Sequence, residues 1–290
     1  MNAFLENDYL QVEIIAKGAE LKSVVNKLTG LEYMWSGDPA FWGKTSPILF
    51  PIVGTLKENI YLYQEKIYSL SRHGFARDQI FGIVEQKKDL VVFSLSSTDS
   101  TSEKYPFGFE LRVIYQVMGD SLEVTYEVRN KGRELMYFSI GGHPAFKVPL
   151  TAGTAYEDYY LEFSETENAP RWPINAEGLI KEQPTPFLNN SAILKLHHDL
   201  FKEDALVFKN LKSNIVSIRS GSHAHGLDFS FDGFPYLGIW AAKQASFVCI
   251  EPWCGLADSE NHDQQLTTKE GIEKIGREEL WTRSWKVKFY

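Results

Sequence analysis

The sequence has few cysteines, no block of basic residues and no long apolar run. Its 290 residues include two cysteines, Cys249 and Cys254. Two are too few for a disulfide framework or a four-cysteine zinc site, so we expect reduced thiols. The formal net charge is −8. Such a surface repels phosphate backbones, which argues against nucleic acid as a partner.

Signals for a membrane or for export are also missing. No stretch approaches the roughly 20 consecutive apolar residues that a membrane-spanning helix needs. The first eight residues lack both the basic start and the apolar segment of a signal peptide. We therefore expect a cytoplasmic protein that has no membrane partner.

Helical periodicity is scarce, whereas strand patterns are frequent. Aromatic residues make up 14% of the chain, and such residues suit half-buried strands. Apolar and polar residues alternate over 111–117 and again over 122–128, with Gly119-Asp120 between them as a tight hairpin turn. A short helix at Thr267–Ile275 is the one helical segment that we expect, although it contains Gly271.

Further strand patterns recur at short intervals with Gly, Asn, Asp and Pro between them. This spacing predicts an all-β fold, a sandwich or a barrel, in place of βαβ units. The stretch 168–190 is rich in Pro, Asn and Gly, and we interpret it as a surface loop inside a single domain that spans residues 1–290. The further predicted strands are Tyr9–Ala16, Glu20–Asn26, Ile80–Gln86, Leu90–Ser96, Tyr159–Phe163, Ile215–Arg219, Leu227–Phe231, Tyr236–Trp240, Ser246–Glu251 and Lys286–Tyr290.

Two titratable residues follow apolar strand patterns beside Gly, Pro or Trp. Glu251 ends an apolar run and precedes Pro252-Trp253. Burial there would raise its pKa and make it a better base, although the local sequence alone favours a solvated or Arg-paired carboxylate. His143 follows two glycines and precedes a proline, where an imidazole can protonate a substrate oxygen near neutral pH. A histidine satisfied within a turn is an equal alternative.

Charged side chains in three other places are weaker candidates. His73 lies between Arg72 and Arg77, a cluster that fits an anionic or polyhydroxylated ligand but also a solvated loop. Asp204 precedes a strand, where a solvated turn carboxylate is the simpler interpretation. His223-Ala224-His225 would present two imidazoles on one strand face, as some metal sites require, but no Glu follows as a third ligand.

Taken together, six segments resemble the aldose 1-epimerase (galactose mutarotase-like) family, in particular its LacX-like branch. They occur in the family's order along nearly the whole chain. The resemblance implies a large antiparallel β-sandwich, the galactose mutarotase-like supersandwich, with a sugar-binding cleft on its concave sheet. The matching segments are Ser46–Pro51, Arg72–Asp78, Tyr105–Phe107, Gly142–Phe146, Asp204–Leu206 and Glu251–Trp253.

The resemblance also implies a role for each matching residue. Glu251 would be the base and His143 the acid that open the sugar ring, acting from opposite sides of the hemiacetal. His73 would contact the ring and anomeric oxygens, and Asp204 would grip hydroxyl groups. By general chemistry, an aromatic side chain such as Trp253 or Phe146 could pack on the C–H face of the sugar. This chemistry needs only proton transfer, so no metal, nucleotide or other cofactor is expected.

The sequence departs from the family pattern where an Arg follows the early Gly. Lys57 stands nearby and could supply charge, but not the bidentate fork of Arg. Arg77 is placed as in the hexose-6-phosphate epimerases of the same fold, whereas their Arg-Gly-Gly is missing before Ser46. A 6-phosphate epimerase, a non-catalytic carbohydrate sensor and a metal-dependent isomerase remain alternatives. Either a monomer or a homodimer is compatible with the exposed edges of a large sheet.

Overall fold

Antiparallel strands form most of the protein. The structure is a computed structural model that describes residues 2–290. Within that range, helical structure consists of the four-residue helix α1 (Asp99–Ser102) and five short 3-10 turns, and no helix is long and apolar enough to cross a membrane. The 3-10 turns are η1 (Lys57–Asn59), η2 (Ala76–Asp78), η3 (Tyr156–Asp158), η4 (His198–Phe201) and η5 (Leu266–Thr268).

The strands belong to two large sheets and three small ones. They are β1 (Asn2–Glu6), β2 (Leu10–Ile15), β3 (Glu20–Asn26), β4 (Ile48–Leu49), β5 (Ile60–Tyr63), β6 (Lys66–Ser69), β7 (Gly82–Gln86), β8 (Leu90–Ser96), β9 (Phe109–Met118), β10 (Ser121–Asn130), β11 (Met136–Phe138), β12 (Ile140–Gly142), β13 (Ala145–Lys147), β14 (Tyr159–Arg171), β15 (Thr185–Lys195), β16 (Leu206–Lys209), β17 (Ile215–Ser220), β18 (Leu227–Ser230), β19 (Tyr236–Trp240), β20 (Phe247–Cys254), β21 (Glu273–Ile275) and β22 (Leu280–Phe289).

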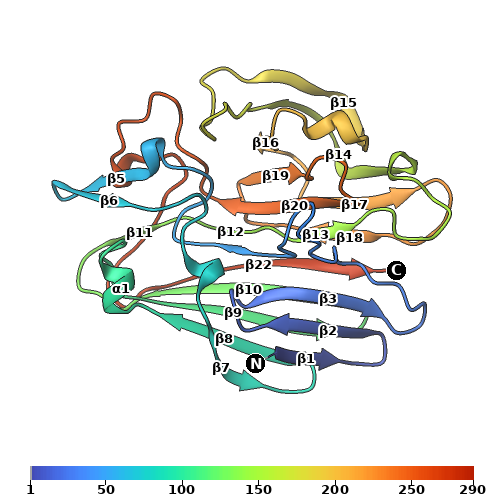
Figure 1. Ribbon diagram of the computed structural model, residues 1–290, viewed down its shortest axis with the longest axis horizontal. Coiled ribbons are helices and arrows are strands. Elements are labelled where there is room, and N and C mark those ends of the chain that lie inside the picture. The colour runs from blue at the N-terminus through green and yellow to red at the C-terminus, as the bar shows by residue number, and fades with distance from the viewer. Residues whose placement is uncertain (1) are drawn as a thin grey trace.

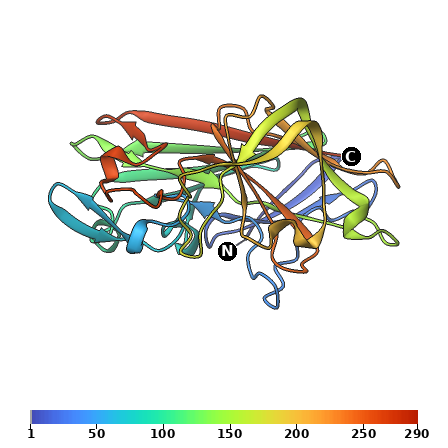
Figure 2. The ribbon, with the colours of Figure 1, turned by 90° about the horizontal axis from the view of Figure 1, so that it is seen from above.

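The larger sheet has nine strands, in the order β15-β14-β17-β18-β22-β10-β9-β8-β7. Its β9–β10 hairpin confirms the predicted turn, since Met118 pairs with Ser121 and Gly119 has a positive φ of 59°. Alternate side chains of both strands are buried, as their sequence pattern predicts. The N-terminal sheet β1–β3 lies beside this sheet, and Figure 2 shows the sheets as layers of an elongated molecule.

The second large sheet, which we call the inner sheet, has the order β16-β19-β20-β12-β4, and β13 also pairs with β20 (Figure 1). All eight residues of β20 are buried, because the strand has a layer on each face. One hydrophobic cluster joins side chains from β1 through β22. A second, smaller cluster around Val207, Trp253 and Ala257 lies at the inner sheet. These observations confirm the all-β, antiparallel sandwich.

Three sequence-based expectations are wrong. The segment 267–275 is no helix: η5 ends at Thr268, Gly271 has a φ of 71°, and β21 then pairs with β11. The segment 168–190 is only partly a loop, because β14 and β15 form a long hairpin that includes both of its ends and whose register shifts absorb irregular residues. Only 172–184 is a loop. His223 and His225 lie in the turn between β17 and β18, not on a strand.

Candidate active site

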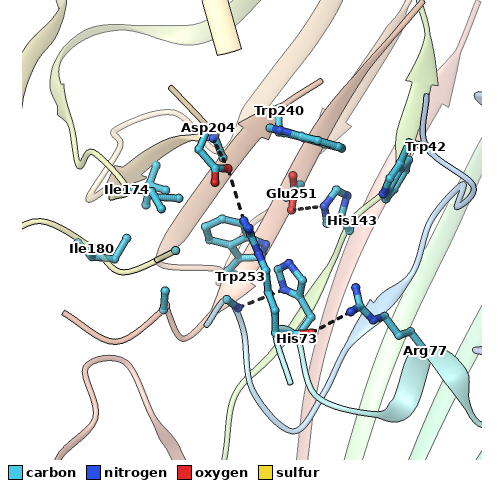
Figure 3. Close-up of a pocket in the computed structure, with 16 residues that line it drawn as sticks. Trp42, His73, Arg77, His143, Ile174, Ile180, Asp204, Trp240, Glu251 and Trp253 are labelled. Carbon is cyan, nitrogen blue, oxygen red and sulfur yellow. Dashed lines mark hydrogen bonds and ion pairs between the residues drawn. The ribbon is translucent and has the colours of Figure 1, made fainter. Parts of the chain in front are cut away.

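The sheet register brings Glu251 and His143 together. Gly141 of β12 pairs with Trp253, and Ala145 of β13 pairs with Cys249, so an unbroken register places His143 opposite Glu251. His143 Nε2 lies 3.3 Å from Glu251 Oε2, and the side chains are 10% and 2% exposed. The two residues thus form a buried carboxyl–imidazole pair that lines a cavity of about 360 Å³ (Figure 3).

Trp253 lies beside this pair because two glycines leave room for its indole. Glu251 and Trp253 are two residues apart on β20, so both side chains project from the same face. A Cβ on Gly141 would lie 2.6 Å from the Trp253 ring, and a Cβ on Gly238 of β19 would overlap it as well. Any larger residue at either position would displace the indole. Its buried Nε1 has no hydrogen-bond partner, which leaves a donor for a ligand.

His73 is held in an unusual backbone conformation. Its φ is 69°, and a Cβ on the following Gly74 would collide with the backbone of Phe50. Two hydrogen bonds to Gly54 hold the turn. The His73 N–H donates to the Gly54 carbonyl at 2.8 Å, and the Gly54 N–H donates to His73 Nδ1 at 3.1 Å. Because Nδ1 accepts, the neutral ring carries its proton on Nε2. The two hydrogen bonds therefore hold His73 in its strained backbone conformation.

Burial sets the protonation of the pair. It raises the pKa of Glu251 well above its usual value; Arg72 opposes this shift and Asp204 adds to it. Burial also lowers the pKa of His143 to about 3, and Arg72 and Arg77 contribute to the decrease. The pKa of His73 is likewise lowered by burial, with His143 the next cause. The unliganded site therefore favours a protonated Glu251 beside a neutral His143.

The charged residues around the cavity are paired with one another. The Arg72 guanidinium lies 3.4 Å from Asp204 Oδ1, and the same oxygen accepts the Ala205 N–H at 2.7 Å. Arg77 donates to the Arg72 carbonyl at 2.9 Å and lies 3.8 Å from Asp78. Each guanidinium group thus has an acidic neighbour, but the buried Arg77 Nε makes no hydrogen bond, and both residues line the cavity (Figure 3).

One end of the cavity is apolar. The loop 172–184 contributes Ile174 and Ile180, which face each other across an isolated bridge. Figure 3 shows both isoleucines on the far side of Asp204 from His143, and Val207 and Ala257 add further apolar lining. The cavity has no Asn, Gln, Ser or Thr in its wall, so its polar contacts come from titratable side chains and indoles. The lining residues are Trp42, Gly54, Arg72, His73, Arg77, His143, Ile174, Gly178, Ile180, Asp204, Ala205, Val207, Trp240, Glu251, Trp253 and Ala257.

Most of the residues proposed from sequence meet at this cavity, and Lys57 does not. Glu251, His143, His73, Asp204, Arg77 and Trp253 all line it. The Lys57 ammonium instead donates to the carbonyls of Glu260 at 2.9 Å and His262 at 3.4 Å. Glu58 and Asn59 both have positive φ, so the chain turns directly after Lys57.

Sequence reasoning missed two tryptophans that surround His143. Trp42 stacks on the imidazole with a centroid distance of 4.9 Å, and Trp240 meets it edge-on at 5.7 Å. Ile174 and Ile180 were missed too, since they lie in what the sequence suggested was a surface loop. A tryptophan at 42, among Gly, Pro and Asp residues, is the one signal that could have been noticed.

Comparison with known proteins identifies the family of this chain. The family model for aldose 1-epimerase matches residues 3–269. The chain belongs to the aldose 1-epimerase family. It is 39% identical to the LacX proteins of Lactococcus lactis subsp. lactis over 285 residues, which covers 95% of each chain.

Solved structures of similar proteins have the same fold. A galactose mutarotase related enzyme from Lactobacillus acidophilus superimposes with a TM-score of 0.95 at 34% identity, over 100% of this chain and 97% of that one. A galactose mutarotase-like protein from Lactobacillus casei ATCC 334 gives 0.93 at 31% identity, over 100% of both chains. The family and the fold together support an isomerase that acts as a sugar epimerase or mutarotase. The resemblance drawn from the six short segments is thereby confirmed.

Proposed function

We propose that this protein is an aldose 1-epimerase that interconverts the α and β anomers of a free aldohexose such as galactose or glucose. One observation carries the proposal: Glu251 and His143 form a buried pair 3.3 Å apart that opens into a cavity large enough for a small ligand. A carboxyl and an imidazole are the two groups that ring opening needs.

Ring opening uses one proton transfer to each group. The Glu251 carboxylate removes the proton from the hydroxyl on C1, and the C1=O bond forms as the bond from C1 to the ring oxygen breaks. The His143 imidazolium gives its proton to that ring oxygen. Rotation about C1–C2 and the reverse transfers then yield the other anomer. Each transfer is typically worth about 10²–10⁴-fold in rate.

The geometry favours proton transfer from one side of the hemiacetal. General ring-opening chemistry had suggested an acid and a base on opposite sides. Both reacting oxygens are bonded to C1, so two groups 3.3 Å apart can each reach one of them. Ring opening leaves Glu251 protonated and His143 neutral, the forms that burial favours through both pKa shifts. The desolvated site thus makes the ionised pair a strong acid and a strong base.

Other cavity residues would bind the sugar. The Nε2–H of His73 is free to donate to the ring or anomeric oxygen, because its Nδ1 accepts from Gly54. Asp204, fixed by Arg72, would accept from hydroxyl groups. Trp253 presents both an apolar face and an unpaired N–H. No step calls for a metal, a nucleotide or a covalent intermediate.

A matched pair of variants separates the roles of the two histidines. His143→Asn should lower kcat by orders of magnitude, because the acid acts mainly in the transition state. His73→Asn should raise KM as well as lower kcat, since its contact also holds the ground state. Steady-state mutarotation kinetics of both variants measure the difference. Small and equal effects would remove the acid role from His143.

A 6-phosphate sugar is the second candidate, because Arg72 and Arg77 both line the cavity. Each guanidinium group already has an acidic neighbour, Asp204 or Asp78, although Arg77 Nε makes no hydrogen bond. Ile174 and Ile180 offer nothing to a dianion. We therefore favour the free sugar. A mutarotation assay over matched free and 6-phosphorylated aldohexoses decides between them. A protein that binds these sugars but accelerates none of them would be a carbohydrate sensor instead.

A further inference from the structure

A cysteine lies directly behind the proposed catalytic pair. Cys249 precedes Glu251 by two residues on β20, so both side chains project from one face of the strand. A sulfur of Cys249, a ring nitrogen of His143 and a carboxylate oxygen of Glu251 lie within 4.8 Å of one another, and all three residues are buried. Within residues 2–290, no other three His, Cys, Asp or Glu residues come so close.

The spacing of these three groups is near that of zinc ligands. Bonds of about 2.0–2.3 Å at tetrahedral angles put neighbouring ligand atoms about 3.4–3.6 Å apart. His143 and Glu251 are already 3.3 Å apart. The sulfur, within 4.8 Å of both, has to approach by no more than about 1.2 Å. Rotation of side chains is enough for such a movement.

The charge of the three ligands also suits a divalent ion. When zinc binds, the Cys249 thiol and the Glu251 carboxyl each release a proton to solvent. The resulting thiolate and carboxylate neutralise two positive charges, and a neutral imidazole adds none, so the buried complex carries no net charge. Thiolate and imidazole select zinc over magnesium or calcium, which prefer oxygen ligands. Arg72 and Arg77 line the same cavity, and each has an acidic neighbour, Asp204 or Asp78.

We propose that His143, Cys249 and Glu251 form a zinc-binding site, and that zinc inhibits the enzyme by occupying the base and the acid at once. His143 and Glu251 line the cavity, which supplies the route of entry and leaves the fourth coordination position to water. The inhibitory part rests on the proposed function. Metal binding itself does not depend on it.

Cobalt(II), which substitutes for zinc in such sites, reports thiolate binding directly. We expect a near-ultraviolet thiolate-to-cobalt charge-transfer band for the wild type. Cys249→Ala should abolish the band. Cys254→Ala is the matched control, because Cys254 is equally buried on the same strand but five positions on, and so projects from the other face. A band that persists in Cys249→Ala, or no band in the wild type, overturns the site.

Zinc inhibition tests the consequence. Each protein is compared with its own rate in chelator, so a change in basal activity does not matter. Removing an outer partner of a ligand costs 10–100-fold in metal affinity, so loss of Cys249 itself should weaken inhibition at least about 100-fold, whereas Cys254→Ala should leave it unchanged. Equal inhibition of the wild type, Cys249→Ala and Cys254→Ala overturns the proposal, as does loss of wild-type activity in chelator. If Cys249→Ala does not fold, Cys249→Ser replaces it. The cobalt band without sugar turnover would refute the epimerase function alone.

Discussion

Replacement of Glu251 by Gln is the sharpest test of the proposed mechanism. Glutamine keeps the shape of the side chain but cannot accept a proton. Bound sugar would fill the cavity that Glu251 lines, and any water left there is a far weaker base than a carboxylate. His143 also loses the carboxylate 3.3 Å away that stabilises its protonated form. One change therefore disables both proton transfers.

The magnitude follows from that double effect. Loss of one transfer costs about 10²–10⁴-fold, or about 2.7–5.5 kcal/mol in the barrier. Because the variant also weakens the acid, we expect the larger of these losses. The kcat should fall to about 10⁻⁴ of the wild-type value or lower. Sugar affinity should change less than about tenfold, since the Arg72–Asp204 and His73–Gly54 contacts do not involve Glu251.

The assay is the anomer exchange rate by NMR, with the uncatalysed rate subtracted, and sugar binding by calorimetry. Glu203→Gln is a matched control: that carboxylate is 58% exposed and is bound to Arg171 at 2.8 Å, outside the cavity lining. It should keep near-normal kcat. A folded Glu251→Gln protein whose kcat stays within about tenfold of the wild type would refute the assignment of the base.

Three further outcomes follow from the same structure. Above the ordinary pKa of 4.5, the folded protein keeps Glu251 protonated while the unfolded chain does not, so this group costs stability as pH rises. The unfolding free energy of Glu251→Gln, measured in urea, should therefore rise relative to the wild type as pH increases above 4.5, and a difference that does not change with pH would contradict the raised pKa. In the wild type, kcat/KM for 6-phosphate sugars should exceed that for free sugars by less than about a hundredfold, and Arg77→Ala should lower kcat/KM for the 6-phosphates more than for the free sugars. A larger preference that Arg77→Ala erases would make the sugar 6-phosphate the substrate. Gly238→Ala should push Trp253 out of place and cost about 1–3 kcal/mol in a thermal melt, whereas Gly221→Ala, where a Cβ meets nothing within 4 Å, should be neutral; equal melting of both variants would exclude the close approach.

The local pattern of the sequence was sufficient for the strands. Alternation with a period of two depends only on neighbouring residues, so β9, β10 and the Gly119 turn were predictable. The helix expected at 267–275 failed because pairing with β11 outweighs a weak helical pattern. The boundaries of β14 and β15 failed because bulges let Asn and Pro enter a long hairpin.

For the site, the short motifs around Glu251, His143 and His73 indicated the chemistry, and the family resemblance supplied their roles. Only the tertiary structure decided which side chains share one cavity. Trp42 and Ile174 line the cavity from loops whose local sequence does not indicate that they lie near it. Lys57 lies outside the cavity lining, because its ammonium donates to two backbone carbonyls. The pKa shifts of the pair likewise come from burial by distant segments. Periodicity is a property of adjacent residues, whereas a cavity and its electrostatics depend on contacts between segments far apart in the chain.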